Sequence, residues 1–337
     1  MRMNVYAKNE YREFEGINVV EGQANDLANI LETGIIDTVC VHFLDKQMWE
    51  VLKGFKDKIR IIVWLHGAEI QPWWRRKFNY KTEDELKRAK KDSNLRMEFW
   101  NEVFSKCREM NIHFVFVSRY FYEMIAKDYN ISIDDEKYSI IHNCIDTNLF
   151  KYYEKEEEAR KNIISIRPYS SNIYANDISV KTVLELSKRD FFEKINFTFI
   201  GDGDLFDQTL KPLKKFSNVN VRKEFLRQDE ISEVYRNNGI VLIPTRGDTQ
   251  GVSRDEAMSC GLVPVTNAVA AIPEFVDDKC GILTDNEDYF AMADGIERLY
   301  RKPEYFLKLS KNAAKRVRNQ TSKEFTIDKE IELINKL

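Results

Sequence analysis

Short apolar runs alternate along the chain with longer amphipathic segments. In the first half, the short runs predict strands at 3–7, 17–20, 38–43, 59–65, 113–117 and 137–141. The longer segments predict helices at 25–31, 48–55, 84–110 (as one helix or two) and 118–126. Ser118 is expected to cap the last of these, because its hydroxyl can accept a hydrogen bond from an otherwise unpaired amide.

The second half repeats this rhythm of strand and helix. Strands are predicted at 162–166, 197–200, 219–221, 240–243 and 263–266, and helices at 179–188, 229–236, 254–259 and 288–301. Strands joined by helices indicate parallel sheets with right-handed crossovers. We therefore expect an α/β protein of two doubly wound, Rossmann-like domains, with ligands bound outside the carboxyl ends of the strands.

The limits of the two domains follow from a change of pattern near the middle of the chain. The stretch 146–161 is acidic and aromatic and shows no strand pattern. We place an N-terminal domain at 1–145, a C-terminal domain at 146–322 and a last helix at 323–337. A chain of 337 residues suits two domains, since a single domain usually has about 100–200 residues.

Composition narrows the classes of partner. The net charge of -3, from 52 basic and 55 acidic residues, gives no case for nucleic acid. Five cysteines without a Cys-x-x-Cys pair predict neither a disulfide framework nor a zinc site, and favour a reducing cytoplasm. The start shows no apolar signal region, and no run approaches the ~18 apolar residues of a membrane span. Any membrane association is therefore expected to be peripheral.

The segment 244–261 carries the clearest chemistry. It follows a predicted buried strand, contains a glycine loop and opens a helix. Backbone amides and the dipole at such a helix start favour an anion, and a diphosphate would suit this position. Asp248 and Glu256 stand eight residues apart, one in the loop and one on the helix. Carboxylates accept hydrogen bonds from vicinal hydroxyls, so one could hold a ribose and the other a transferred sugar.

This segment resembles the Glu-x7-Glu signature of the family 4, or "group 1", retaining glycosyltransferases, which have the GT-B fold. The resemblance continues downstream through 261–265, 272–276 and 281–283. Upstream, 141–150 resembles the family's interdomain segment, and 199–203 resembles its Gly-Asp-Gly turn after a strand. These matches stand in the family's order and cover about half the chain.

The resemblance implies a role for each matching residue. Glu256 would hold the nucleotide ribose, and Asp248, where the family usually has glutamate, would contact the donor sugar. Arg167 would stabilise the leaving diphosphate, because arginine stays charged and offers a fixed fork of donors. His66, after a first-domain strand, would lie near the transferring sugar. The remaining expected donor-binding residues are Thr249, Gln250, Gly251, Val252 and Ser253.

Two departures from the family pattern keep alternatives open. The family normally has a lysine a few residues after the arginine, whereas here the next lysine is Lys181. Family members also usually begin with a strand and a glycine-rich loop before the segment that opens this chain. These departures and Asp248 leave two other readings: a catalytically silent, glycosyltransferase-like binding subunit, or a GT-B sugar-nucleotide epimerase.

Several further residues receive structural interpretations. Asp202-Gly203-Asp204 has the form of an Asp-x-Asp metal motif, but its place in the chain favours a turn, and we expect no metal. His42, His113 and His142 are interpreted as structural.

Aromatic and basic residues gather at 71–81, followed by a basic run at 87–91. This region could rest on an anionic membrane, line an acceptor groove or form a solvated face. The candidate membrane contacts are Trp73, Trp74, Arg75, Arg76 and Lys77.

Taken with the resemblance, these features predict a retaining, metal-independent glycosyltransferase of the hexosyltransferase type that needs no cofactor. Its donor would be a nucleoside-diphosphate sugar and its acceptor a glycan or a lipid-linked molecule. Catalysis would come from stabilising the leaving nucleoside diphosphate and orienting the acceptor hydroxyl. The family association suggests bacterial surface polysaccharide synthesis, in the cytoplasm at the inner face of the membrane.

Overall fold

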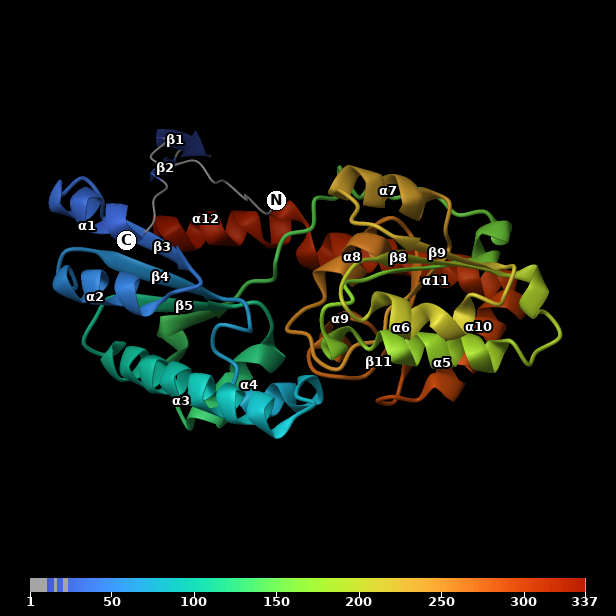
Figure 1. Ribbon diagram of the computed structural model, residues 1–337. Coiled ribbons are helices and arrows are strands. Elements are labelled where there is room, and N and C mark those ends of the chain that lie inside the picture. The colour runs from blue at the N-terminus through green and yellow to red at the C-terminus, as the bar shows by residue number, and fades with distance from the viewer. Residues whose placement is uncertain (1–10, 15–16, 21–23, 337) are drawn as a thin grey trace. The chain divides into compact units, whose positions relative to one another are not determined.

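The computed structural model describes residues 11–14, 17–20 and 24–336, and its chain forms two compact units (Figure 1). Unit 1 comprises Met1–Arg75, Thr82–Cys144 and Thr326–Leu337, and unit 2 comprises Arg76–Lys81 and Ile145–Phe325. The chain thus passes from unit 1 to unit 2 after Cys144. The hydrophobic pattern does not predict that the six residues Arg76–Lys81 join unit 2. The strand expected at 3–7 lies outside the described residues.

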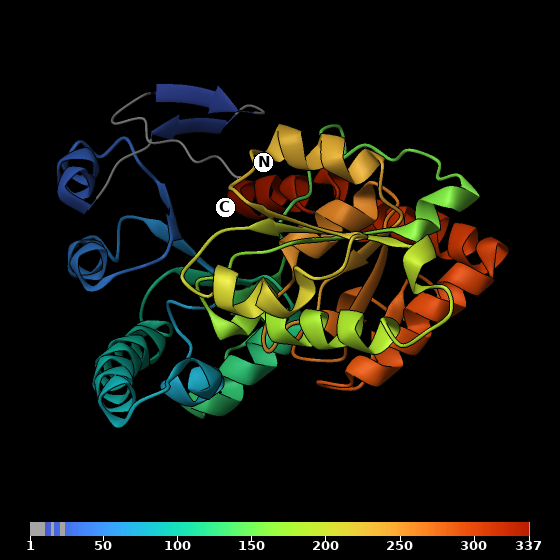
Figure 2. The ribbon, with the colours of Figure 1, turned by 45° about the vertical axis from the view of Figure 1, so that its right-hand side comes forward.

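Unit 1 contains a parallel sheet whose described strands lie in chain order. These are β3 (Thr38–His42), β4 (Arg60–Leu65), β5 (Ile112–Phe116) and β6 (Tyr138–Ile140). Before them, β1 (Tyr11–Phe14) and β2 (Ile17–Val20) form a separate antiparallel hairpin, drawn as the dark blue arrows of Figure 2.

Four helices of unit 1 contribute to one core cluster with the sheet. They are α1 (Ala24–Glu32), α2 (Lys46–Gly54), α3 (Glu83–Lys106) and α4 (Arg119–Tyr129). Trp49 of α2 and Trp100 of α3 are buried with Ile61 and Val63 of β4. Ser118 caps α4 as predicted, since its Oγ accepts from the Phe121 amide at 3.1 Å. Such caps help a sequence to stop one element and begin the next.

The last helix, α12 (Ile327–Asn335), supplies a second cluster in unit 1. Ile62 and Trp64 alternate with Ile61 and Val63 along β4, so they point to the opposite face of the sheet. There they pack with Leu333 of α12. The Trp64 indole N–H donates to the Glu330 carboxylate at 2.9 Å, and Glu330 is also on α12. The sequence-distant end of the chain is therefore part of the unit 1 fold.

Unit 2 contains a six-stranded parallel sheet in the order β12-β11-β10-β7-β8-β9. The strands are β7 (Asn162–Ile166), β8 (Asn196–Gly201), β9 (Val219–Lys223), β10 (Ile240–Leu242), β11 (Val263–Asn267) and β12 (Ile282–Thr284). The chain fills one side of β7 with β8 and β9, then returns to place β10 on the other side. This reversal is the double winding that the sequence predicts, and β7 and β10 flank the switch point.

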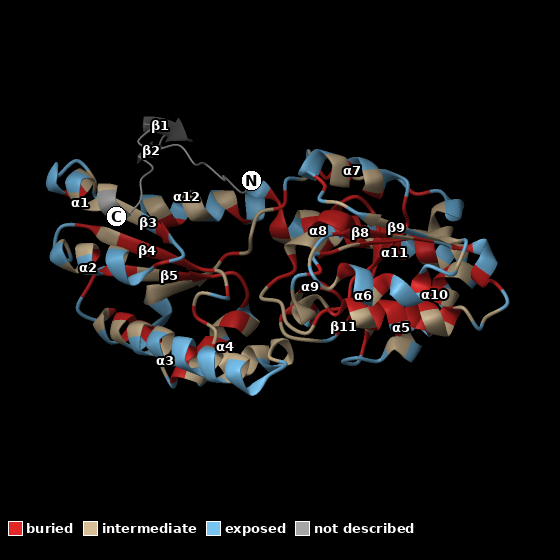
Figure 3. Ribbon diagram, viewed as in Figure 1, coloured by how far each residue is buried: buried red, intermediate tan, exposed pale blue. Residues whose placement is uncertain are grey.

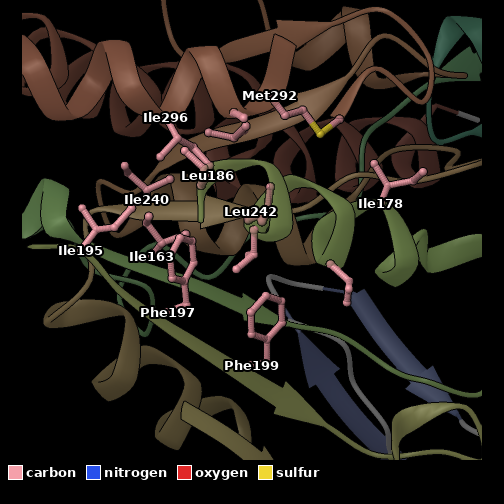
Figure 4. Close-up of a cluster of buried hydrophobic side chains, with 14 of the residues drawn as sticks. Ile163, Ile178, Leu186, Ile195, Phe197, Phe199, Ile240, Leu242, Met292 and Ile296 are labelled. Atoms are coloured by element: carbon pink, nitrogen blue, oxygen red, sulfur yellow. The ribbon is translucent and has the colours of Figure 1, made fainter. Parts of the chain in front are cut away.

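Helices and sheet of unit 2 share a large apolar core (Figure 4). Phe197 and Phe199 of β8 and Leu242 of β10 lie in it together with Met292 of α10 and Leu186 of α5. The helices are α5 (Asn176–Leu186), α6 (Phe206–Leu210), α7 (Gln228–Arg236), α8 (Val252–Ser259), α9 (Ile272–Phe275), α10 (Tyr289–Arg301) and α11 (Pro303–Thr321). Short 3-10 turns are η1 (Trp73–Asn79), η2 (Asp135–Lys137), η3 (Glu157–Lys161), η4 (Asn172–Tyr174), η5 (Phe192–Lys194), η6 (Lys211–Leu213) and η7 (Lys323–Phe325).

Burial follows the element pattern within each unit (Figure 3). The strands are mostly buried, whereas α3 alternates between buried and exposed positions along its length. Every strand predicted from residue 38 onward is present, with ends shifted by at most two residues. The sequence reading missed β1, β12, α6, α9 and the 19-residue helix α11.

Candidate functional site

The carboxyl ends of β7 and β10 carry the two parts of the predicted anion site in unit 2. Arg167 follows β7 directly, and the loop 243–251 leads from β10 into α8. Because these two strands are neighbours in the sheet, the arginine and the loop meet at one edge. Their meeting point is the topological switch point, where ligands of doubly wound sheets bind.

Arg167 is a buried cation whose hydrogen bonding is incomplete. Its side chain is 5% exposed, and Nη1 donates to the Ser253 hydroxyl at 3.1 Å. Its guanidinium lies 4.8 Å from the centre of the Tyr174 ring, and its Nε has no hydrogen-bond partner among the described residues. Burial lowers the pKa of Arg167, while the nearby Asp248 carboxylate acts in the opposite direction. A buried charge in this state would be stabilised by an anion that reaches it.

The Gly-Asp-Gly turn after β8 fixes the backbone of Arg167. The Arg167 amide donates to the Ile200 carbonyl at 3.0 Å, and a Cβ added at Gly201 would stand 1.9 Å from the Arg167 carbonyl oxygen. Gly203 has φ of +137°, and its Cβ would approach the Tyr169 carbonyl carbon to 2.4 Å. The glycines therefore allow two strand ends to touch. Within the described ranges, no three His, Cys, Asp or Glu side chains are grouped to hold a metal ion.

The loop 243–251 is held by bonds from both sides. Asn267, at the end of β11, accepts from the Thr245 amide at 2.9 Å and donates to the Thr245 carbonyl at 2.8 Å. Asp248 Oδ1 accepts from the Gln250 amide at 3.1 Å, and the Asp248 carbonyl accepts from the Ala271 amide at 3.2 Å. Asp248 is thereby fixed at the loop's turn, close enough to influence Arg167 electrostatically.

Helix α8 begins at this loop with a left-handed glycine. Gly251 has φ of +97° and occupies the N-cap, a conformation that glycine adopts without steric cost. The first amides of a helix have no partner within the helix and carry its positive dipole end. Val252 and Ser253 form this first turn, and Ser253 also contacts Arg167. The predicted diphosphate-binding residues and Arg167 are thus brought together.

Glu256 lies one turn further along α8 and is 9% exposed. Burial raises the pKa of Tyr235, and the Glu256 carboxylate adds to this effect, so the phenol stays neutral. The residues just before Glu256 on α8 are buried and bond to one another. Arg254 and Asp255 form a buried ion pair at 2.6 Å, and the Gln250 side chain donates to Asp255 at 3.2 Å. The predicted donor contact of Gln250 would therefore have to use its backbone.

Lys181 of α5 and Arg246 of the loop 243–251 are both paired with carboxylates. Lys181, the first lysine after Arg167, lies 3.9 Å from the Asp177 carboxylate. Arg246 donates to both oxygens of Asp177 at 2.8 and 2.9 Å and pairs with Glu287 at 2.6 Å. Both cations are thereby occupied by carboxylates. Sequence reasoning missed this network, as it missed Tyr174 and Asn267.

Residues 76–81, which belong to unit 2, support the turn η4. The Asn79 side-chain oxygen accepts from the Ser171 hydroxyl at 2.9 Å and from the Asn172 amide at 3.2 Å. The Asn172 side chain in turn donates to the Phe78 carbonyl at 3.1 Å. Because η4 carries Tyr174, whose ring contacts the Arg167 guanidinium, the hydrogen bonds of Asn79 help to hold this ring in place.

Two of the predicted membrane-contact residues, Trp74 and Arg75, instead bond to a side chain of unit 1. Arg75 donates to both oxygens of Asp128 at 2.8 Å, and the Trp74 indole N–H donates to the same carboxylate at 3.3 Å. Lys90 covers the Trp73 ring at 4.8 Å. The structure gives no support to Trp74 and Arg75 as membrane anchors. None of the described helices is long and apolar enough to cross a bilayer.

His66 lies in unit 1, at the carboxyl end of β4, and is joined to His42. His42 Nδ1 and His66 Nε2 are 2.9 Å apart, a contact that sequence reasoning did not foresee. The Glu69 carboxylate accepts hydrogen bonds from the amides of His66 and Gly67.

The two other histidines make contacts inside the fold of unit 1. His113 bonds Ser139 at 2.8 Å, and desolvation lowers the pKa of His113 to about 4. His142 Nδ1 lies 2.7 Å from the Val117 carbonyl oxygen, as a structural role requires.

Two parallel-sheet α/β units, each with the doubly wound or chain-order arrangement described above, place the protein in the GT-B class of fold. Comparison with known proteins agrees with this assignment. Residues 160–302 match the model of the family described as "Glycosyl transferases group 1". The second unit of the chain is therefore similar to the group 1 glycosyltransferases, in agreement with the resemblance seen in the sequence.

Individual relatives show how far the likeness extends. The D-inositol 3-phosphate glycosyltransferase of Saccharomonospora viridis is 32% identical over 85 residues, which are 25% of this chain and only 20% of that protein. A glycosyltransferase from Rickettsia africae superimposes with a TM-score of 0.69 at 14% identity, covering 92% of this chain and 79% of its own. Anabaena HepE in complex with UDP-glucose superimposes with a TM-score of 0.66 at 14% identity, covering 92% of this chain and 82% of HepE. At these identities the structural matches show a common fold.

Proposed function

We propose that this chain is a retaining glycosyltransferase that moves a sugar from a nucleoside-diphosphate sugar to a glycan or lipid-linked acceptor. The observation that carries the proposal is Arg167, a buried cation with an unpaired Nε beside the first turn of α8. Asp248 and Glu256 stand on the loop and the helix next to it. Positive charge flanked by two carboxylates suits a diphosphate that carries a ribose on one end and a sugar on the other.

In this proposal, Arg167 and the α8 amides stabilise the leaving diphosphate. As the bond between the sugar and the diphosphate breaks, negative charge grows on the phosphate oxygens. Fixed donors placed there lower the barrier, because they need not reorganise during the reaction. Glu256 accepts hydrogen bonds from the ribose hydroxyls, and Asp248 accepts from the donor sugar. His66, in unit 1, is assigned to the transferring sugar by the resemblance alone.

The proposed reaction does not require a metal ion, because Arg167 and the helix supply the positive charge. We expect EDTA to leave sugar transfer unchanged; activity that is lost with EDTA and restored by manganese would overturn this part. The names of similar structures support a sugar-nucleotide donor and a role in surface glycans. One is HepE with UDP-glucose, and another is WaaG, described as involved in lipopolysaccharide biosynthesis. The exposed basic residues of α3 would allow the enzyme to work at the inner face of a membrane.

The proposal is tested by comparing ligands that differ only in the diphosphate. Calorimetry should show that UDP or another nucleoside diphosphate binds wild-type protein far more tightly than its nucleoside. Arg167→Gln should remove most of this difference, lowering diphosphate affinity by about 30-fold or more, since a charge-assisted contact contributes roughly 2 kcal/mol. Arg222→Gln, at a partly exposed arginine paired with Glu224, is the matched control and should change nothing. Equal affinities for nucleotide and nucleoside would refute the proposed site.

A further inference from the structure

Four aromatic rings form a continuous stack at the carboxyl ends of β3 and β4 in unit 1. The rings follow the order Trp64, His42, His66, Phe43, with centre-to-centre distances of 5.0, 5.2 and 4.7 Å. Successive planes differ by only 19°, 21° and 28°. Trp64 is buried against α12, whereas Phe43 ends the stack with a ring that is 60% exposed. The stack therefore leads from the core of unit 1 to the surface at the carboxyl edge of its sheet.

Phe43 is also held in an unfavourable backbone conformation. Its φ is +56°, in the left-handed region that bulky L-residues rarely adopt. A glycine would make the same turn without strain, so the turn itself does not call for a phenylalanine. Its neighbours Val41 and Leu44 are buried, which shows that the surrounding chain fixes the turn. Phe43 is thus unfavourable in two respects, its backbone strain and the exposure of its apolar ring to water. Strained residues of this kind cluster at ligand-binding sites.

We propose that the exposed ring of Phe43, backed by the His66 ring stacked behind it, forms a platform on which a pyranose ring of the acceptor stacks. This rests on the proposed function, which assigns the donor to unit 2 and leaves the acceptor to the ligand edge of unit 1. The C–H hydrogens on one face of a pyranose carry slight positive charge and pack against the negative face of an aromatic ring. Behind the Phe43 ring, His42 Nδ1 and His66 Nε2 are hydrogen-bonded to each other at 2.9 Å, which holds the stacked rings in place. Phe43 is thus a residue that selects the acceptor.

The test uses methyl pyranosides as probes, because they carry no nucleotide. Saturation-transfer NMR would measure the binding of methyl α- and β-glycosides of glucose, galactose, mannose and N-acetylglucosamine. We expect at least one to bind wild type and Phe43→Tyr alike, and to bind Phe43→Ala and Phe43→Gly at least about tenfold more weakly. Phe290→Ala removes another exposed phenylalanine, 51% exposed on α10, and should leave pyranoside binding unchanged.

A measurement of stability separates the platform from a structural role. Phe43→Gly relieves the left-handed strain, so its thermal midpoint should equal or exceed that of wild type although pyranoside binding falls. A lower midpoint, or equal pyranoside binding in Phe43→Ala and wild type, would overturn the platform. A change of oligomeric state in Phe43→Ala on gel filtration would instead assign the ring to contact with a second copy. The affinity for UDP, measured in parallel, should stay within about twofold of wild type in every Phe43 variant. If wild type does not bind UDP at all, the proposed function is contradicted. The platform is then still tested by the pyranoside measurements, which do not involve the nucleotide.

Discussion

At the scale of single residues, the proposed site depends on glycines, whose lack of a side chain allows close contacts, as well as on charged side chains. Gly201, Gly203 and Gly251 let backbone or buried side chains approach where a Cβ would collide. Gly201 and Gly203 make room for the strand end that carries Arg167, whose amide donates to the Ile200 carbonyl at 3.0 Å. Gly201 and Gly203, at the end of β8, therefore help to fix the backbone position of the cation.

A pair of glycine substitutions tests this packing. Gly201→Ala should destabilise unit 2 by about 3 kcal/mol or more, because the added Cβ would lie 1.9 Å from a backbone oxygen. Gly247→Ala, in the loop before α8, should change stability by less than ~0.5 kcal/mol, since its nearest neighbours are side-chain atoms 3.8 Å away. Urea unfolding followed by far-ultraviolet circular dichroism measures both. Similar losses in the two variants would contradict the close approach.

The two acidic residues should separate the parts of the donor. Glu256→Ala is expected to weaken binding of UDP about tenfold, because a hydrogen-bonding ribose contact is lost. Asp248→Ala should leave UDP affinity nearly unchanged and abolish the difference between one UDP-sugar and another. Calorimetry with UDP and UDP-sugars distinguishes them. Identical effects of the two variants on every ligand would mean that the ribose and sugar assignments are wrong.

Residue roles could be predicted only where a local pattern carried them. The loop 243–251 and the start of α8 were recognisable, because glycines, acids and a following helix stand together in the chain. Asn267 and Tyr174 come from other segments and act through contacts that only folding creates. Asn79 is the extreme case, since it lies 92 residues before its partner Ser171.

At the scale of elements, hydrophobic periodicity predicted the strands well and the connecting helices less well. Strand β10 and the five residues of β4 after Arg60 are continuous apolar runs, a signal that needs no knowledge of the fold. Helix α11 was missed although Pro303 stands at its first position, which is a usual start signal. Its apolar residues, such as Phe306 and Val317, are spaced among many charges, so the stripe is clear only once its buried side is known.

The contribution of α12 to unit 1 can be measured at one position. Leu333 is 6% exposed and packs with Ile62 and Trp64, so Leu333→Ala should destabilise unit 1 by about 2 kcal/mol. Glu332→Ala, on the exposed side of the same helix, is the control and should have little effect. Tryptophan fluorescence during urea unfolding is the readout, because all five tryptophans lie in unit 1. Equal midpoints for Leu333→Ala and wild type would show that α12 adds no stability.

At the scale of the whole molecule, the two units have separate apolar cores and carry different proposed sites. Unit 2 carries the buried cation and the acids of the proposed donor site, and unit 1 carries the aromatic stack. The sequence predicted two Rossmann-like halves, because both show strands joined by helices. It could not predict that residues 76–81 would join unit 2, because such an exchange leaves no periodic signal.

Acid should weaken unit 1 through His113. Desolvation lowers its pKa from 6.5 to about 4 in the folded chain, so the unfolded chain binds more protons between these values. The stabilisation is present above pH 6.5 and is lost as the pH falls towards 4, by roughly 1–3 kcal/mol. Tryptophan-detected unfolding of wild type and His113→Gln across this range checks it. The glutamine should reduce the dependence but not remove it, because desolvation also lowers the pKa of His42 in unit 1 to about 4. An NMR pKa of His113 near 6.5 would contradict it.

The most direct test of the account is calorimetric titration of UDP, GDP, ADP and CDP, and their common sugars, into wild-type protein, Arg167→Gln and Glu256→Ala. The account predicts that one nucleoside diphosphate binds wild type, that Arg167→Gln loses most of the affinity contributed by the diphosphate, and that Glu256→Ala loses a smaller part. Absence of binding by every nucleotide, or binding that survives Arg167→Gln unchanged, would contradict the claim that this site holds a nucleoside-diphosphate sugar.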